Sequence, residues 1–300
     1  MGILIKCEGA TFDKKYVIDT VELPDPDCPH EYDNDCDAEC NLCGATRIVT
    51  HNYVGGYCTV CGKKDPDKVW AIDEYPVTDT LKGLYDLGGT VEASLVNHAP
   101  NPVATGAPSI SGDTHTVSED YITFNGESKN RMMPTLPMHK LENGIVLVAL
   151  FSTPTGTQTR PLISNRRAGT GARYVGMGLY SDRVEIAVEG ATTAGVYNFD
   201  EPVHSNNFAI LAFSGNTSGY RVVRYSNGTL TTLLEYTGSV NGWETNTFQI
   251  GGDGTGNVYP NAPAHISLAA IHEGDVTAKQ LESICEFVKA YGEQKGLTIE

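Results

Sequence analysis

Residues 28–61 read CPHEYDNDCDAECNLCGATRIVTHNYVGGYCTVC and contain six of the eight cysteines and two of the eight histidines of the chain. Two turns within this stretch have the same form, CNLCG at residues 40–44 and CTVCG at residues 58–62. The C-x2-C spacing places two sulfurs on one side of a tight turn, and the glycine lets backbone amides face the thiolates. Two such turns predict a tetrahedral zinc site. Its four ligands are Cys40, Cys43, Cys58 and Cys61.

Four more residues with metal-binding side chains lie in the same stretch, namely Cys28, His30, Cys36 and His51. By type and number they predict a second zinc site. Three alternatives stay open. They are a disulfide between Cys28 and Cys36 beside one zinc, a different division of the eight residues between two ions, and a disulfide-stapled loop without metal. Paired CxxC turns suit metal binding better than disulfide geometry.

We expect this zinc-ribbon-like module to be structural. About 35 residues with few aliphatic side chains cannot bury enough apolar surface to fold alone. Zinc binding worth about 10–16 kcal/mol would replace the missing core. A catalytic zinc needs an open coordination position, whereas the ligands here are numerous enough to close the site. The segment also repeats itself weakly, because HEY at residues 30–32 precedes the first turn and HNY at 51–53 precedes the second.

The composition and patterning of the chain argue against several kinds of partner and location. With 37 acidic and 21 basic residues the formal net charge is -16, which argues against a nucleic-acid partner. No run approaches the roughly 18 apolar residues that a membrane span needs, so no membrane insertion is expected. The first twelve residues lack the features of a signal peptide. Cys7 and Cys285 are interpreted as buried thiols, which indicates assembly in a reducing compartment.

The pattern predicts four segments. Residues 1–24 contain two strand-like runs and are expected to form a small β element for attachment. The zinc module spans residues 25–67. Residues 68–120 are expected to be a connector with at most one leading strand, and a short helix or strand is expected around residues 77–87. The main domain spans residues 121–300.

The main domain has an all-β pattern as far as residue 267. Ten short apolar or alternating runs are separated by turn residues, such as the SNG of residues 226–228. Residues 276–292 predict one amphipathic helix with Thr277 as its N-cap. Ten strands at this spacing predict a two-sheet sandwich, so the expected fold class is mainly β with one terminal helix.

Three short motifs in this domain carry a resemblance to a known fold family. They are YITFNG at residues 121–126, FQIGG at 248–252, and AAI at 269–271, which runs into the helix and YGEQKGL at 291–297. In this order they resemble the concanavalin A-like jelly rolls of the laminin G type. The resemblance implies a sandwich that binds glycans or proteins, and some members of the fold are glycanases.

The sequence predicts no catalysis. Retaining glycanases of this fold place carboxylates at alternate positions of one strand, as in ExDxE, because acid and nucleophile must lie about 5–5.5 Å apart. No such triplet occurs in residues 121–300. Glu185 and Glu189 lie four residues apart and are interpreted as solvated charges on a strand. A nucleophile elbow of the form GxSxG is also missing.

Loops are where a rigid sandwich would bind a ligand. Six loop residues are the candidates, namely Trp243, Tyr259, Asp253, Asn257, Arg166 and Arg167. The two aromatic rings would stack on sugars or pack into the core. The Gly-rich segment 251–257 would hold calcium or a sugar hydroxyl, or form a flexible turn. The two arginines would contact an acidic glycan or a neighbouring subunit, or remain solvated.

Two further resemblances concern function. GILIKCEGATF at residues 2–12 resembles the start of virion-appendage proteins from phages of gut bacteria. HEYDNDCDAECNLCGATRIVTHNY at residues 30–53 resembles a repeat in large surface proteins of anaerobic gut bacteria and their phages. These resemblances imply a non-enzymatic tail or head fibre protein, assembled in the host cytoplasm and attached to other virion proteins through its N-terminal strands.

The jelly roll of such a virion protein would meet a host-surface glycan or protein, and a trimer is common among fibres. Two alternatives stay open. One is an adhesin on the surface of a bacterial cell, and the other is a glycan hydrolase of the concanavalin A-like fold.

Overall fold

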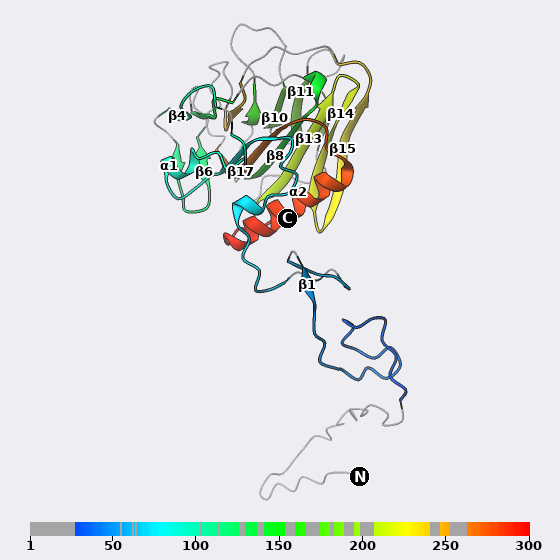
Figure 1. The fold of residues 1–300 in the computed structure, drawn as a ribbon. Helices are drawn as coiled ribbons and strands as arrows, with labels where there is room; N and C mark the ends of the chain where they lie inside the picture. Colours follow the sequence, from blue (N-terminus) through cyan, green and yellow to red (C-terminus); the bar gives the residue numbers. More distant parts are fainter. Residues whose placement is uncertain are drawn as a thin grey trace, which may run out of the picture. The chain divides into compact units, whose positions relative to one another are not determined.

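The computed structural model describes residues 28–54, 56–61, 63, 65–102, 104–112, 115–125, 130–136, 141–153, 160–165, 175–180, 183–188, 195–198, 207–240, 247–252 and 263–300. The chain divides into two units, Met1–Lys68 and Val69–Glu300 (Figure 1). The expected attachment element at residues 1–24, with Cys7, lies outside the described residues. In the first unit, β1 (Tyr53–Val54) pairs antiparallel with β2 (Tyr57–Cys58).

The second unit is a sandwich of two antiparallel sheets, which confirms the expected mainly β fold with one long terminal helix. Within the described residues one sheet has eight strands. These are β3 (Leu81–Asp86), β5 (Thr116–Val117), β6 (Ile122–Phe124), β8 (Ile145–Ser152), β13 (Ala209–Asn216), β14 (Gly219–Ser226), β15 (Thr229–Thr237) and β17 (Ala264–Glu273).

The other sheet has seven strands among the described residues. They are β4 (Ser109–Ser111), β7 (Arg131–Met133), β9 (Arg160–Ser164), β10 (Val175–Tyr180), β11 (Arg183–Val188), β12 (Gly195–Asn198) and β16 (Gln249–Ile250). The helical elements are η1 (Ile72–Glu74), α1 (Val91–Ser94), η2 (Leu141–Asn143) and α2 (Ala278–Gln294). Among the residues that the structure describes, no helix is both long and apolar enough to cross a membrane.

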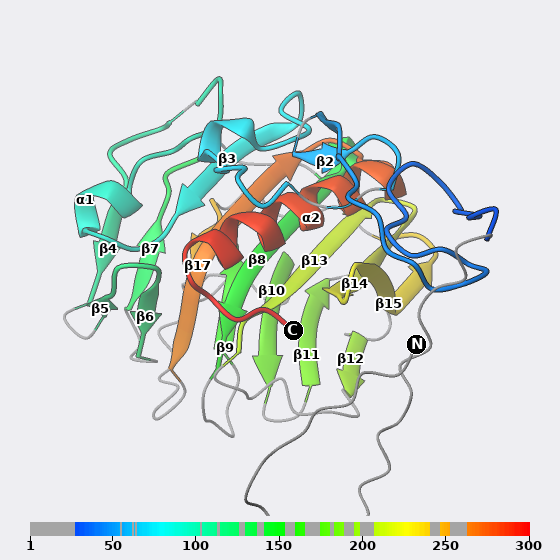
Figure 2. The same ribbon diagram turned by 90° about the horizontal axis from the view of Figure 1, so that it is seen from below.

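Strand β8 lies between two apolar layers, and its sequence IVLVALFS shows why. Every residue of the strand is buried. Alternate residues, from Ile145 to Phe151, belong to the core between the sheets. The residues between them face the opposite side, where α2 packs, and a Cβ on Gly292 of α2 would lie 2.6 Å from Leu150 Cδ2. Figure 2 shows α2 lying across this sheet. A strand covered on both faces reads as a continuous apolar run.

Strand β17 changes its orientation at a bulge. Its pairing with β8 shifts register between Ile266 and Leu268. The bulged Ser267 donates its hydroxyl to the carbonyl of Asp120 at 2.6 Å, and its own carbonyl accepts the N–H of Leu87 at 2.8 Å. On one side of the bulge β17 pairs with β6, and on the other side it pairs with β3. The bulge thus lets two strands share one edge of β17.

The expected connector at residues 68–120 is therefore corrected. Residues from Val69 onward belong to the second unit, and the segment expected around 77–87 is the sheet strand β3. Leu84 and Tyr85 of this strand are fully buried. The strand is short and its partner lies far away in the sequence, so the local pattern left a helix and a strand open at this place.

Helix α2 begins and packs as the sequence predicts. The hydroxyl of Thr277 accepts the N–H of Gln280 at 3.2 Å and closes a capping box. The apolar stripe of the helix is buried, including the thiol of Cys285. Near its C-terminus, Tyr291 donates its hydroxyl to Asp86 of β3 at 2.6 Å. This bond ties the helix to β3, the element for which the sequence left a helix and a strand open.

His272 of β17 is buried between the sheet and residues 75–80. Its Nε2 lies 3.0 Å from the hydroxyl of Tyr75, and its Nδ1 lies 2.9 Å from the hydroxyl of Thr80. Burial lowers the pKa of His272 to about 3. The two hydroxyls satisfy both ring nitrogens of the neutral form, so this histidine is a structural part of the core.

Candidate metal centres and a polar groove

The eight Cys and His side chains of the metal module (residues 28–61) form two clusters. The first cluster is Cys28, His30, Cys40 and Cys43, and the second is Cys36, His51, Cys58 and Cys61. Within each cluster the ligand atoms all lie within 4.8 Å of one another. The two CxxC turns do not share a site, so the expected four-cysteine site is wrong as a grouping. The structure instead has the alternative in which the eight residues divide differently between two positions.

The first cluster has the dimensions of a tetrahedral metal site. Cys28 Sγ lies 3.8 Å from Cys40 Sγ, and Cys43 Sγ lies 3.4 Å from His30 Nδ1. Zn–S bonds of about 2.3 Å and Zn–N bonds of about 2.0–2.1 Å imply ligand separations of about 3.5–3.8 Å in a tetrahedron. His30 also adopts a left-handed backbone with φ +48°, an uncommon conformation for a histidine. Three sulfurs and one nitrogen would close the site around one ion.

The second cluster repeats this geometry. Cys36 Sγ lies 3.4 Å from Cys58 Sγ, and Cys61 Sγ lies 3.4 Å from His51 Nδ1. A disulfide needs an S–S separation of about 2.05 Å, and all six cysteines of the module are free thiols. Cys28 and Cys36 fall into different clusters, so the structure does not contain the disulfide alternatives.

The two halves of the module are a structural repeat. The first cysteine of each turn donates its N–H to the carbonyl five residues further on, from Cys40 to Ala45 at 2.9 Å and from Cys58 to Lys63 at 2.8 Å. The next residue in each turn donates its N–H to the carbonyl of the residue after the cluster's histidine. These bonds run from Asn41 to Glu31 at 2.9 Å and from Thr59 to Asn52 at 3.0 Å. The weak sequence repeat therefore corresponds to the same local fold, formed twice.

One ligand departs from the repeat and links the two halves. Cys28 precedes His30 by two residues, but the equivalent position before His51 is Val49. The second cluster takes Cys36 instead, which lies between ligands of the first cluster in the sequence. The ligand sets are therefore interleaved. The loop that closes around the first cluster also carries Cys36 of the second cluster. The two halves therefore cannot move independently of each other.

Side-chain hydrogen bonds hold the loop that carries Cys36. The side chain of Asn34 accepts the N–H of Cys36 at 2.8 Å. Arg47 donates to the carbonyls of Asp37 and Asn34 at 2.9 and 2.7 Å, and its guanidinium lies 3.8 Å from the ring centroid of Tyr32. Such Asx-type bonds replace an apolar core in fixing a short loop.

Backbone amides favour a thiolate in each turn. The N–H groups of Cys61 and Val60 lower the pKa of Cys58 to about 5. Burial raises the pKa of Cys40, but the N–H groups of its own turn, with Leu42 first, outweigh it and lower the pKa to about 6. Thiolates are the ligand form of cysteine, so each turn presents one sulfur ready for a metal cation.

The two cysteines outside the CxxC turns, Cys28 and Cys36, behave in the opposite way. The neighbouring Cys43 raises the pKa of Cys28 to about 11, and burial raises the pKa of Cys36 to about 12. These two sulfurs hold their protons until a cation displaces them. Metal binding to this module therefore releases protons.

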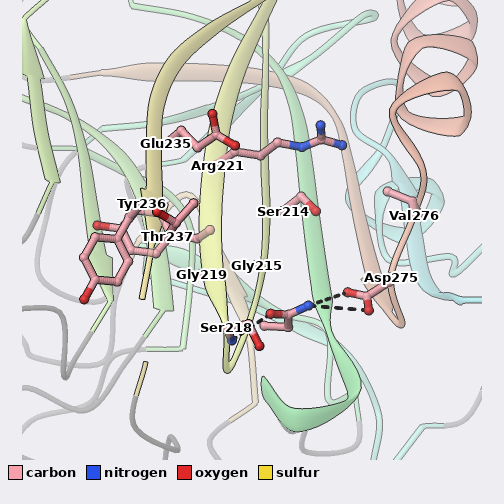
Figure 3. Close-up of a pocket in the computed structure, with 12 residues that line it drawn as sticks. Ser214, Gly215, Ser218, Gly219, Arg221, Glu235, Tyr236, Thr237, Asp275 and Val276 are labelled. Carbon is pink, nitrogen blue, oxygen red and sulfur yellow. Dashed lines mark hydrogen bonds between the residues drawn. The ribbon is translucent and has the colours of Figure 1, made fainter. Parts of the chain in front are cut away.

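The loop residues expected to bind a ligand lie outside the described residues. This holds for Trp243, Tyr259, Asp253, Asn257, Arg166 and Arg167. What the structure describes instead is a polar groove of about 300 Å³ on the sandwich, where β13, β14 and β15 meet the loop before α2 (Figure 3). Its lining is Ser214, Gly215, Asn216, Ser218, Gly219, Tyr220, Arg221, Glu235, Tyr236, Thr237, Asp275 and Val276.

Three polar side chains lie side by side in the groove, because they occupy paired positions on neighbouring strands. Ser214 is the cross-strand partner of Arg221, and Arg221 is the partner of Glu235. Arg221 is half-buried and Glu235 is exposed. At the rim, Asn216 donates its amide to the two carboxylate oxygens of Asp275 at 3.2 and 3.5 Å. The sequence shows Arg221 only as a polar residue in an alternating strand, because the register of the β13–β14 and β14–β15 hairpins decides which side chains lie beside it.

Comparison with known proteins shows the fold class. Neither a family model nor a curated relative matches the chain in sequence. A Trypanosoma rangeli sialidase in complex with 2,3-difluoro-KDN matches with a TM-score of 0.50 and 13% identity, over 72% of this chain and 33% of that chain. The binding domain of botulinum neurotoxin serotype D matches with a TM-score of 0.51 and 10% identity, over 71% and 52%.

A further structure of the serotype D ligand-binding domain contains N-acetylneuraminic acid and matches with a TM-score of 0.51 and 9% identity, over 71% of this chain and 52% of that chain. At these identities the likeness shows a shared β-sandwich fold. The chain spans about a third of the sialidase and about half of the toxin domain.

Proposed function

We propose that this chain is a non-enzymatic carbohydrate-binding protein whose sandwich binds a surface glycan. The observation that carries the proposal is the β-sandwich fold, which is shared with a toxin domain whose structure contains N-acetylneuraminic acid. The sandwich also has an open polar groove with donors and acceptors of hydrogen bonds. Sugar hydroxyls need both kinds of partner.

The metal module is proposed to hold two zinc ions in a structural role. Three thiolates and one imidazole in a tetrahedral arrangement are ligands that zinc prefers. Each cluster has four ligands, so no coordination position stays open for a substrate. The interleaved ligands make the module a rigid joint rather than a flexible linker.

We place the protein in a virion, as an appendage of a phage of gut bacteria assembled in the host cytoplasm. The support is the resemblance of residues 2–12 and 30–53 to such proteins. Residues 1–24 would attach the chain to other virion proteins, in a trimer as in many fibres. A bacterial surface adhesin is the alternative that uses the same binding chemistry. Mass spectrometry of purified particles tests this placement, and absence of the chain from the particles refutes it.

A glycan hydrolase is the second candidate, because sialidases are among the proteins that share the fold. However, the sialidase match covers only a third of that chain. The sequence also lacks the strand with alternating carboxylates that glycanases of the sandwich type use. Binding without cleavage is therefore the function we favour.

The decisive experiment measures binding of the labelled, zinc-loaded full chain to cells of gut bacteria. Saturable binding that purified capsular polysaccharide removes supports the proposal. Absence of binding at micromolar concentration contradicts it. Incubation of the same polysaccharide with the protein, followed by a reducing-sugar assay, tests the enzymatic alternative, and release of reducing ends would establish a hydrolase.

A further inference from the structure

We infer that the groove between β13, β14 and β15 binds a neutral sugar through adjacent hydroxyl groups, with Arg221 and Glu235 as the main contacts. This inference rests on the proposed carbohydrate-binding function and assigns it to a place on the sandwich. The groove lies on the face of the eight-stranded sheet that also carries α2.

The hydrogen-bonding capacity of the groove is unused at its centre. Arg221 and Glu235 are cross-strand partners, yet neither side chain makes a hydrogen bond or ion pair with any other described residue. A guanidinium offers only donors and a carboxylate only acceptors. Two neighbouring hydroxyls of a sugar match this pair, because one accepts from Arg221 while the other donates to Glu235. Ser214 lies next to Arg221 in the same row and adds a group that does both.

The charge of the groove selects against acidic sugars. Its lining contains one cation, Arg221, and two carboxylates, Glu235 and Asp275. The whole chain carries a formal net charge of -16. A sugar carboxylate bound to Arg221 would lie beside Glu235 and be repelled. A neutral sugar avoids this repulsion.

The frame of the groove is fixed by the backbone. The contacts lie on paired strands, and the bond from Asn216 to Asp275 fastens the β13–β14 hairpin to the loop before α2. Gly219 has φ +153°, and a Cβ there would lie 2.3 Å from the carbonyl oxygen of Tyr236. No side chain can therefore fill the groove at this position. Ligand pockets start at about 300 Å³, so a groove of this size suits one or two sugar rings.

Aromatic stacking plays little part in this site. The ring of Tyr236 stacks on Tyr220 at a centroid distance of 5.3 Å and an interplanar angle of 25°, and Tyr220 belongs to the buried core. Tyr236 itself packs against the core, on the opposite face of the strand from Glu235, so recognition at Arg221 and Glu235 depends on hydrogen bonds to charged groups. Removing one partner of such a bond weakens binding by about tenfold or more.

The test uses the full zinc-loaded chain and a panel of methyl glycosides and short oligosaccharides. The neutral members end in glucose, galactose, mannose or N-acetylglucosamine, and the acidic members end in N-acetylneuraminic or glucuronic acid. Saturation-transfer NMR identifies the bound sugars, and titration gives Kd. The variants are Glu235→Gln and Arg221→Gln. Thr232→Ala is the matched control, since it is exposed on the same strand and does not line the groove.

We expect a neutral sugar to bind, Glu235→Gln and Arg221→Gln each to raise its Kd about tenfold or more, and Thr232→Ala to leave it unchanged. Equal unfolding midpoints would show that the exposed Glu235→Gln variant is folded. A neutral sugar bound with the same Kd by all variants overturns the groove assignment and leaves the proposed function intact. Binding confined to acidic sugars overturns the neutral class. If neither the panel nor capsular polysaccharide binds, both proposals fail.

Discussion

The two units of this chain reach a defined structure in different ways. Among the described residues of the metal module, the buried apolar ones are Cys40 and Cys58, and the turns expose Leu42 and Val60 to 55% and 53%. The sandwich instead has one continuous apolar core between its sheets. The potential metal ligands of the module therefore converge on two points, whereas the sandwich is held by buried area. Each unit should respond to a perturbation that leaves the other unaffected.

Removal of metal should have the largest effect and should be confined to the module. Zinc sites of this kind contribute about 10–16 kcal/mol to folding, and the module has no core to replace them. After chelation under reducing conditions, limited proteolysis should cut within residues 28–61 and leave residues 69–300 intact. Elemental analysis of the untreated chain should give two zinc ions. Cleavage of the sandwich at the same rate would show that the two units are not stabilised independently.

Paired substitutions test which of the Cys and His residues share one metal site. Cys28→Ser with Cys40→Ser removes two ligands of the first cluster, so one tightly bound zinc should remain in the second. Cys40→Ser with Cys58→Ser removes one ligand from each cluster, so neither site keeps four. A four-cysteine site would give the reverse result for these two variants. Cys285→Ser is the control, because this thiol lies in the sandwich and its loss should leave two zinc ions.

A cavity in the sandwich core should have the next largest effect. Phe151 on β8 is 1% exposed and belongs to the core between the sheets. Phe151→Ala should lower the free energy of unfolding by about 3–5 kcal/mol, through lost burial and the cavity it leaves. Chemical denaturation measures this change, and Thr231→Ala on the exposed edge of the sheet is the control. The zinc content should not change, and a loss of zinc would show that the units depend on each other.

Acid should produce the smallest of these effects within the sandwich. Burial lowers the pKa of His272 from 6.5 to about 3. Below pH 6.5 the unfolded chain binds a proton at this residue that the folded chain does not. The free energy of unfolding should therefore fall as the pH decreases, by at most about 1.4 kcal/mol per unit from this group. Above pH 6.5 this contribution is fully present.

The acid effect is measured by denaturation at pH 7 and pH 5.5, followed by tryptophan fluorescence. Both tryptophans, Trp70 and Trp243, lie in residues 69–300, so the signal reports on that unit. His272→Gln keeps a donor and an acceptor for the two hydroxyls and should reduce the dependence on pH. An identical pH dependence in the variant would show that other groups are responsible.

Local patterns predicted the elements that carry their own signal. The apolar run of β8 and the stripe and N-cap of α2 are properties of adjacent residues, so the sequence displays them directly. The eight ligand side chains were also found, because Cys and His at such close spacing are typical of metal sites. Strand β3 was left open between a helix and a strand, because it is short and its partner β17 lies at the far end of the chain. The groove was missed because it depends on the register of the β14–β15 hairpin, which pairs Arg221 with Glu235, and on Asp275 from a distant segment.

The sequence by itself therefore determined the mainly β sandwich, its terminal helix and the set of residues able to bind metal. Periodicity, capping and ligand spacing act over a few residues and are written into the order of the chain. The tertiary structure alone decided which ligands share a cluster, with Cys36 joining His51 rather than Cys28. It also decided where β17 bends to admit β3 and which polar groups meet in the groove. Such contacts depend on loop closure and sheet register over long separations, which no local pattern encodes.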